Sequence, residues 1–192
     1  EVRDITAELE SGKNKGYVAL WNKIKEISTK DIKSIYKELN TDFDLWEGES
    51  DAFPYIKETI DTMEKSGYLI ESEGAKIVEV IEDTDKAPMP PLVVIKSNGA
   101  TLYATRELAT ITSRMKRFNP KEMWYIADIR QGLYFEQVFR AAYKTKLVPE
   151  STILEYYGFG TMNGTDGKPF KTRDGNAATL KSLIKSVKEE IL

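Results

Sequence analysis

The sequence predicts an α/β protein in which helices cover a parallel β-sheet, with a helical segment and β-hairpins before it. Two short apolar runs, residues 123–127 and 153–157, are typical of buried strands, and a helical pattern follows each of them. Strands and helices that alternate with short connections favour parallel pairing. The length of 192 residues fits one ordinary domain, or one domain with a helical appendage.

Apolar spacing predicts the elements of the first third. Residues 1 to about 40 are charged and helical, with Leu20, Ile24 and Ile27 at helical spacing. Ser28 is typical of a helix start, which divides this stretch into two helices. The apolar spacing over residues from about 51 to 66 predicts another amphipathic helix, which ends at Gly67. We therefore separate a helical segment, residues 1–50, from an insertion that begins at residue 51.

The insertion, residues 51–104, continues as hairpins. Residues 68–70 and 77–81 are apolar and flank a turn around Gly74, whereas residues 92–95 and 101–103 flank the turn pair Asn98-Gly99. Residues 105–192 then alternate: a helix to Phe118, the first strand, a helix over about 131–143, the second strand, a glycine-rich loop and a last helix. This third part contains the predicted parallel sheet.

Histidine and cysteine are both absent. Their absence excludes disulfides, thiolate metal sites and a Ser-His-Asp mechanism, and we expect no metal site. Chemistry must use carboxylates, lysines, hydroxyls or backbone amides. The net charge of −3 argues against indiscriminate nucleic-acid binding. No apolar run has the length of a membrane span and no signal peptide is present, so we expect a cytoplasmic protein without membrane contact.

Polar residues follow both predicted strands, where open parallel sheets bind ligands. Asp128, Arg130 and Gln131 follow the first strand. A glycine-rich loop follows the second strand, and it contains two lysines three residues apart, Lys168 and Lys171. Such a loop can wrap polyphosphate and neutralise charge during nucleotidyl transfer. An ordinary solvated turn around Asp166-Gly167 explains the same residues, and composition alone favours it.

Tyr103 and Glu107 form a second candidate pair. The spacing predicts that Tyr103 ends a strand and that Glu107 lies in the first turn of the next helix, at its inward edge. A carboxylate near an apolar seam needs a partner, and a cationic ligand is one candidate. The positive end of the helix or a nearby arginine is the simpler explanation. The basic face over residues 106–121 is better explained by solvation than by RNA binding.

Taken together, these segments resemble arginyl-tRNA synthetases, a class I family, from about residue 16 to the end. The resemblance is carried by ordered strings: Ala19-Leu20-Trp21, Phe43-Asp44, Glu49-Ser50, the stretches 69–75 and 102–106, Asp128-Ile129-Arg130-Gln131, Gly158-Phe159-Gly160 and 167–173. Each string alone is a weak signal, whereas their order and spacing together are specific. The resemblance implies half of a Rossmann-like catalytic domain, split by a connective insertion.

The same resemblance implies the substrates, which are L-arginine, ATP and tRNA(Arg), with Mg²⁺ carried by ATP. Tyr103 and Gln131 match residues of the arginine pocket, and Glu107 stands where the family usually has an aspartate that binds the guanidinium. Gly158, Phe159 and Gly160 match the place where adenosine is held. Residues 168–172 match the degenerate lysine loop, in which Lys168, Lys171 and Thr172 stabilise the adenylation transition state.

Some features depart from the family pattern. Glu107 is longer than aspartate by one methylene, and Tyr134 stands where many relatives have histidine. The paired-histidine phosphate motif is absent, the chain starts at Glu1 without methionine, and no anticodon-binding domain follows. We therefore expect an inactive piece of an arginine–tRNA ligase. The alternatives are a stand-alone paralogue that binds nucleotide, arginine or a partner without ligase activity, and an unrelated nucleotide-binding protein.

Overall fold

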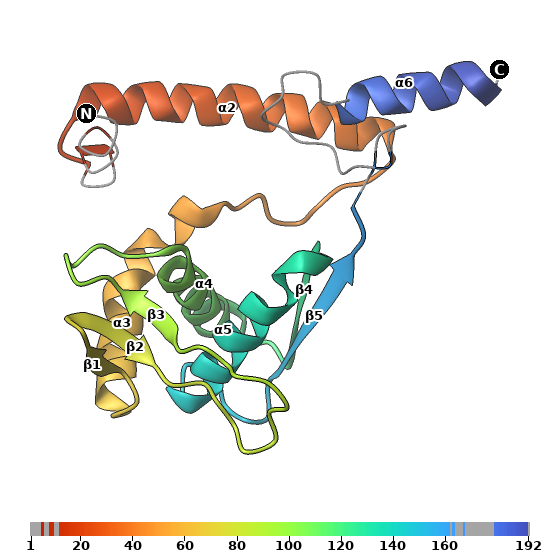
Figure 1. The fold of residues 1–192 in the computed structure, drawn as a ribbon. Helices are drawn as coiled ribbons and strands as arrows, with labels where there is room; N and C mark the ends of the chain where they lie inside the picture. Colours follow the sequence, from red (N-terminus) through yellow and green to blue (C-terminus); the bar gives the residue numbers. More distant parts are fainter. Residues whose placement is uncertain are drawn as a thin grey trace. The chain divides into compact units, whose positions relative to one another are not determined.

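The computed structural model describes residues 5, 8–9, 12–161, 163, 167 and 179–191. The chain divides into two compact units, residues 47–170 and residues 1–46 with 171–192. Figure 1 shows the elements in chain order, and each unit is described separately. The predicted site residues at positions 103–160 all belong to the first of these units.

In the described part of the smaller unit, the longest element is the helix α2 (Lys15–Glu38). The Asn14 side chain caps its start by accepting hydrogen bonds from the amides of Gly16 and Tyr17, at 3.1 and 3.2 Å. The predicted helix start at Ser28 is wrong, because no glycine or proline interrupts the helix there and serine is tolerated inside it. Helix α6 (Leu180–Ile191) is the last element of this unit.

The larger unit begins with the 3-10 helix η1 (Glu49–Tyr55) and continues directly into α3 (Ile56–Lys65). The sequence predicted one α-helix over this stretch. Pro54 explains the difference, since it has no amide hydrogen for an α-helical bond and so favours a tighter first segment. Gly67, at a φ of 78°, ends α3 as predicted.

Three strands form an antiparallel sheet in the order β1 (Ile70–Ser72), β2 (Ala75–Val78) and β3 (Leu92–Ile95). The first hairpin turns through Glu73 and Gly74 as expected, both with positive φ. The expected strand over residues 101–103 is wrong. Only Thr101 bridges to Ile95, and Tyr103 already belongs to the next helix.

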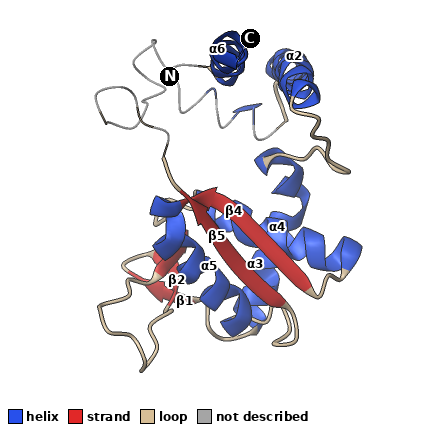
Figure 2. Ribbon diagram, turned by 90° about the vertical axis from the view of Figure 1, so that its right-hand side faces the viewer, coloured by secondary structure: helices blue, strands red, loops and turns tan. Residues whose placement is uncertain are grey.

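The predicted parallel sheet is present as two strands, β4 (Glu122–Asp128) and β5 (Ile153–Phe159), which pair in parallel over their whole length. Helix α4 (Tyr103–Phe118) precedes β4, and helix α5 (Gly132–Lys144) connects the two strands after the short 3-10 helix η2 (Ile129–Gln131). Figure 2 shows the strands side by side, with α4 and α5 behind them. The α/β fold class is therefore confirmed.

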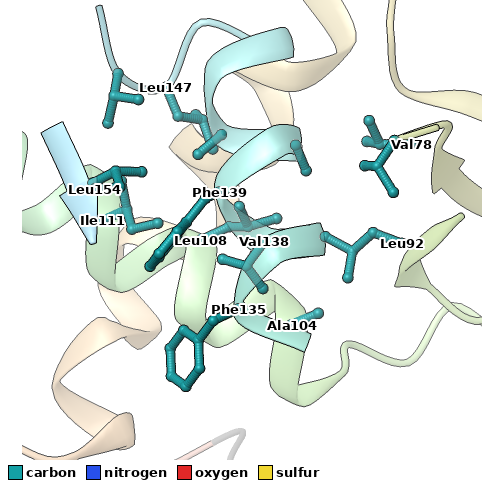
Figure 3. Close-up of a cluster of buried hydrophobic side chains, with 14 of the residues drawn as sticks. Val78, Leu92, Ala104, Leu108, Ile111, Phe135, Val138, Phe139, Leu147 and Leu154 are labelled. Atoms are coloured by element: carbon teal, nitrogen blue, oxygen red, sulfur yellow. The ribbon is translucent and has the colours of Figure 1, made fainter. Parts of the chain in front are cut away.

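The core of the larger unit lies around α4 and α5, between one face of this sheet and the antiparallel sheet, which contributes Val78 and Leu92 (Figure 3). Leu108, Ile111 and Val138 are fully buried there. The opposite face of the sheet remains open: Trp124 is 60% and Ile126 71% exposed. In the part of the chain that the structure describes, this apolar face is exposed, although parallel sheets are normally covered on both faces.

Candidate functional site

Helix α4 places Tyr103 and Glu107 one helical turn apart on the same side of the helix. The start of the helix is fixed by Thr105, whose hydroxyl donates to the Val94 carbonyl of β3 and accepts a bond of 2.9 Å from the Leu102 amide. Because α4 begins at Tyr103, Glu107 lies in its second turn and not in the first. The positive end of the helix is therefore a poor explanation for this carboxylate.

Glu107 lies in a pocket of about 160 Å³ between α4 and η1. The pocket is lined by Glu47, Gly48, Glu49, Asp51, Ala52, Glu107, Thr110, Ser113 and Arg114. Carboxylates outnumber the single guanidinium in this lining. Such a pocket is electrostatically suited to a small cationic ligand.

Burial raises the pKa of the Glu107 carboxyl above its ordinary value. The guanidinium of Arg114 opposes this shift, whereas the negative charge of Glu49 adds to it. A second cation in the pocket would stabilise the charged carboxylate, because it would offset both the burial and the repulsion from Glu49. The energetics of Glu107 thus favour a positively charged ligand.

Glu49 is a member of this site that sequence spacing did not reveal. It begins η1, far from α4 in the sequence, and its carboxylate accepts a hydrogen bond of 3.1 Å from the Arg106 guanidinium. Its charge acts on both Tyr103 and Glu107. The Glu49-Ser50 string carried part of the family resemblance, but only the fold brings this carboxylate beside Glu107.

The ring of Tyr103 packs against the ring of Tyr134 from α5, with centroids 5.2 Å apart and planes tilted by 32°. Tyr103 remains 43% exposed. Burial raises the pKa of its hydroxyl, and the charges of Glu107 and Glu49 raise it further. The structure thus brings together an aromatic surface and two carboxylates, which is the combination that recognises a planar cation.

Gln131 is half-buried at the end of η2, directly after β4. Within the described residues, no hydrogen bond joins it to Tyr103 or Glu107. Its neighbour Arg130 binds both carboxylate oxygens of Asp128, at 2.8 and 2.7 Å. This contact holds the pKa of Asp128 down to about 2, so Asp128 stays charged and paired at the end of the strand.

The glycine turn lies at the same sheet edge as Asp128, because β4 and β5 are parallel and Asp128 pairs with Phe159. Gly158 approaches the turn after β4 so closely that a Cβ there would lie 3.0 Å from the Ile129 Cα. Only glycine fits this approach without displacing backbone. At Gly160 a Cβ would meet nothing within 4 Å. Phe159 is exposed at this edge.

The predicted phosphate-binding residues Lys168, Lys171 and Thr172 lie outside the described residues. The basic face of α4, in contrast, is described and is occupied by acidic partners. Lys116 contacts Glu58 at 2.8 Å, and Arg117 contacts Glu47 at 2.6 Å. These ion pairs join α4 to α3 and to the residues just before η1, so both basic side chains have acidic partners within the protein.

The family described as class I tRNA synthetases (R), catalytic domain, matches residues 1–191. This chain belongs to that arginyl-tRNA synthetase family. The arginine–tRNA ligase of Agathobacter rectalis is 50% identical over 187 residues, which cover 97% of this chain and 31% of the relative. The enzyme of Alkaliphilus oremlandii is 47% identical over the whole chain and 32% of its own length. This synthetase chain thus spans about a third of the curated relatives.

Solved structures agree with the assignment. The arginyl-tRNA synthetase of Plasmodium falciparum superposes on 79% of this chain with a TM-score of 0.69 and 26% identity, and 26% of that chain is covered. The Thermus thermophilus synthetase covers 98% of this chain, and 36% of its own, with a TM-score of 0.74. At 16% identity the second likeness shows the fold alone. Among the helices that the structure describes, none has the length and apolarity needed to span a bilayer.

Proposed function

We propose that this chain is part of an arginine–tRNA ligase, which activates L-arginine with ATP and transfers it to tRNA(Arg). The observation that carries the proposal is the acidic pocket of Glu49 and Glu107 beside Tyr103. A guanidinium is planar and permanently charged, and it pairs with carboxylates through parallel hydrogen bonds. Family membership over residues 1–191 supports the same substrate.

In this proposal, Glu107 and Glu49 bind the guanidinium of arginine and Tyr103 provides an aromatic wall. Gln131, at the end of β4, orients the rest of the amino acid. The extra methylene of Glu107 relative to aspartate shifts its carboxylate by roughly 1 Å. A displacement of this size is enough to change the rate of a reaction that depends on how the substrate is oriented. The partial burial of Glu107 is consistent with a pocket that accommodates the longer side chain.

ATP is proposed to bind across the sheet edge where β4 and β5 end. Gly158, Phe159 and Gly160 are exposed at this edge, and they are proposed to form the adenosine site. Lys168, Lys171 and Thr172 are proposed to bind the phosphates, with Mg²⁺ arriving as part of the ATP substrate. These three assignments rest on the family resemblance, since their positions lie outside the described residues.

The reaction needs positioning and charge stabilisation more than a protein base. A carboxylate oxygen of arginine attacks the α-phosphorus of ATP, the bond to the bridging oxygen breaks, and pyrophosphate leaves with the electron pair. The lysines then stabilise the charge that develops on the phosphates. A terminal ribose hydroxyl of tRNA next attacks the adenylate carbonyl and releases AMP. This chemistry is compatible with a chain that has no histidine.

We propose that residues 1–192 are inactive alone. The chain spans 31% of its relative, and one face of the β4–β5 sheet is apolar and open within the described residues. The remaining polypeptide is proposed to cover this face and to supply the other half of the ATP site. Residues 1–50 are proposed as a helical segment, 51–104 as the connective insertion and 105–192 as half of the Rossmann-like domain. The complete protein is proposed to act in the cytoplasm.

ATP–pyrophosphate exchange tests this function. The complete protein should exchange pyrophosphate only with arginine present, in the presence of tRNA(Arg), whereas residues 1–192 alone should not. Lysine and citrulline serve as controls, since lysine has charge without the planar fork and citrulline has the shape without charge. Exchange by the isolated chain would show that its active site is complete. A complete protein that binds arginine without any exchange would favour a binding paralogue.

A further inference from the structure

The hydroxyl of Tyr134 is buried and has no hydrogen-bond partner within the described part of the chain. Tyr134 lies in the first turn of α5, and its ring packs between Tyr103 at 5.2 Å and Phe135 at 5.4 Å. These ring contacts hold the phenol ring in place, and its hydroxyl oxygen is shielded from solvent. An unpaired buried hydroxyl is costly, and its retention points to a partner that is acquired in another state of the site.

Glu107 provides a complementary group. Its carboxylate accepts no hydrogen bond and forms no ion pair among the described residues, although it is half-buried. Burial raises the pKa of Tyr134 above its ordinary value, and the charge of Glu107 raises it further. Tyr134 packs on Tyr103, and Tyr103 lies one helical turn before Glu107 on α4, so the two groups belong to the same site. Tyr134 remains a protonated donor. A donor without an acceptor thus lies near an acceptor without a donor.

Resting on the proposed arginine chemistry, we propose that Tyr134 is a positioning residue for Glu107. Its hydroxyl donates a hydrogen bond to the Glu107 carboxylate when the guanidinium of arginine occupies the pocket. A carboxylate has enough lone pairs to accept this proton and a two-pronged guanidinium contact at once. The bond fixes the carboxylate plane, which the flexible glutamate side chain does not do alone. Tyr103, which packs on Tyr134, forms the adjacent wall.

Steady-state kinetics of the complete protein with Tyr134→Phe test this role. The substitution keeps the ring and removes only the hydroxyl. We expect the KM for arginine to rise about tenfold, as for a lost hydrogen bond to a charged group. The kcat and the KM for ATP should change by less than about twofold, since the interaction affects arginine binding alone. Tyr68→Phe, which removes an exposed hydroxyl, should change none of these values.

The melting temperature separates positioning from a structural role. Without arginine, Tyr134→Phe should keep or raise the melting temperature of the complete protein, because it removes an unpaired buried hydroxyl. In a Glu107→Gln background, Tyr134→Phe should raise the arginine KM far less than it does alone. An unchanged arginine KM, independent effects of the two substitutions, or a lower melting temperature would each overturn the inference. If the unsubstituted protein fails to activate arginine, the proposed function falls first and this inference falls with it.

Discussion

Arg140 binds both carboxylate oxygens of Asp85 at 2.7 Å, although the two residues lie 55 positions apart. The same guanidinium donates to the Val80 carbonyl at 3.0 Å. These bonds connect the long loop between β2 and β3 to α5, the helix that carries Tyr134. The side chains of Asp85 and Arg140 are only 12% and 16% exposed. The loop between β2 and β3 is therefore attached to α5 by a shielded ion pair.

Asp85→Asn should lower the melting temperature and change its pH dependence. Arg140 and the Glu82 amide lower the pKa of Asp85 from its ordinary value of 3.8 to about 2. A depressed pKa stabilises the fold above the ordinary value, and this stabilisation is lost as the pH falls from 3.8 towards 2. Melting curves between pH 2 and 7 should therefore converge for the two proteins at low pH. Asp61→Asn, which breaks an exposed pair with Lys57, is the control and should have little effect.

Gly158→Ala should destabilise the protein by about 1–3 kcal/mol, since its Cβ would press on the backbone of Ile129 in a packed turn. The midpoint of chemical denaturation measures this change. Gly160→Ala is a matched control two residues away, where the new Cβ meets nothing within 4 Å. Equal stability of the two variants would contradict the close approach of β5 to the turn after β4.

Arginine binding should weaken at acid pH, because burial raises the pKa of Glu107 and only its charged form attracts a guanidinium. Isothermal titration of the complete protein should show this loss as the pH falls through the raised pKa. Arg114 and Glu49 act on the same carboxylate, and both are retained in the unsubstituted protein and in the Glu107→Gln variant. Glu107→Gln should bind arginine roughly 10- to 100-fold more weakly, and this pH dependence should flatten.

Without arginine, the contribution of Glu107 to the free energy of unfolding should change with pH in the opposite direction to arginine binding. A carboxyl with a raised pKa in the fold favours folding when it is protonated, and this contribution is lost as the pH rises through the folded value.

Ile126→Lys should have opposite effects on the isolated chain and on the complete protein. In the isolated chain Ile126 is 71% exposed, so a charge there should reduce self-association, which sedimentation measures. In the complete protein the same charge should lower the melting temperature, because the open sheet face is proposed to be covered. Glu122→Lys is the control, because this position at the start of β4 already carries a charge. A complete protein that tolerates Ile126→Lys would argue that this face stays open.

Lys171→Ala should reduce the rate of adenylate formation in the complete protein more than it weakens arginine binding. The expected reason is that the lysine stabilises charge on the leaving phosphates, which develops in the transition state. Single-turnover kinetics separate the two effects. Lys65→Ala, in the last turn of α3, should leave both unchanged. An unchanged rate for Lys171→Ala would remove this lysine from the catalytic assignment.

Strong local patterns made much of the fold predictable. The apolar runs of β4 and β5, the helical stripe of Leu108 and Ile111, and the glycine that ends α3 are each local signals. Parallel pairing followed from the order of strands and helices. The start of α4 was less predictable, because Tyr103 has good strand propensity and Thr105 fixes the helix start only through a bond to Val94.

The candidate site was predictable only in part. Glycines and lysines at strand ends were visible in the sequence, as was the spacing of Tyr103 and Glu107. Glu49 and the unpaired Tyr134 hydroxyl became apparent only in three dimensions, since both depend on contacts between distant segments. Spacing along one helix carries no information about a carboxylate that another segment contributes.

For the proposed arginine site, the bond from Thr105 to Val94 has a consequence for how selectivity can evolve. The helix turn that carries Tyr103 is fixed to the middle of a β-hairpin strand, so a small change in that strand moves the pocket wall. Laboratory selection for enzymes that accept an arginine analogue should therefore include residues 92–95 in its libraries. Altered selectivity could then arise from a remote backbone adjustment while both pocket carboxylates are retained.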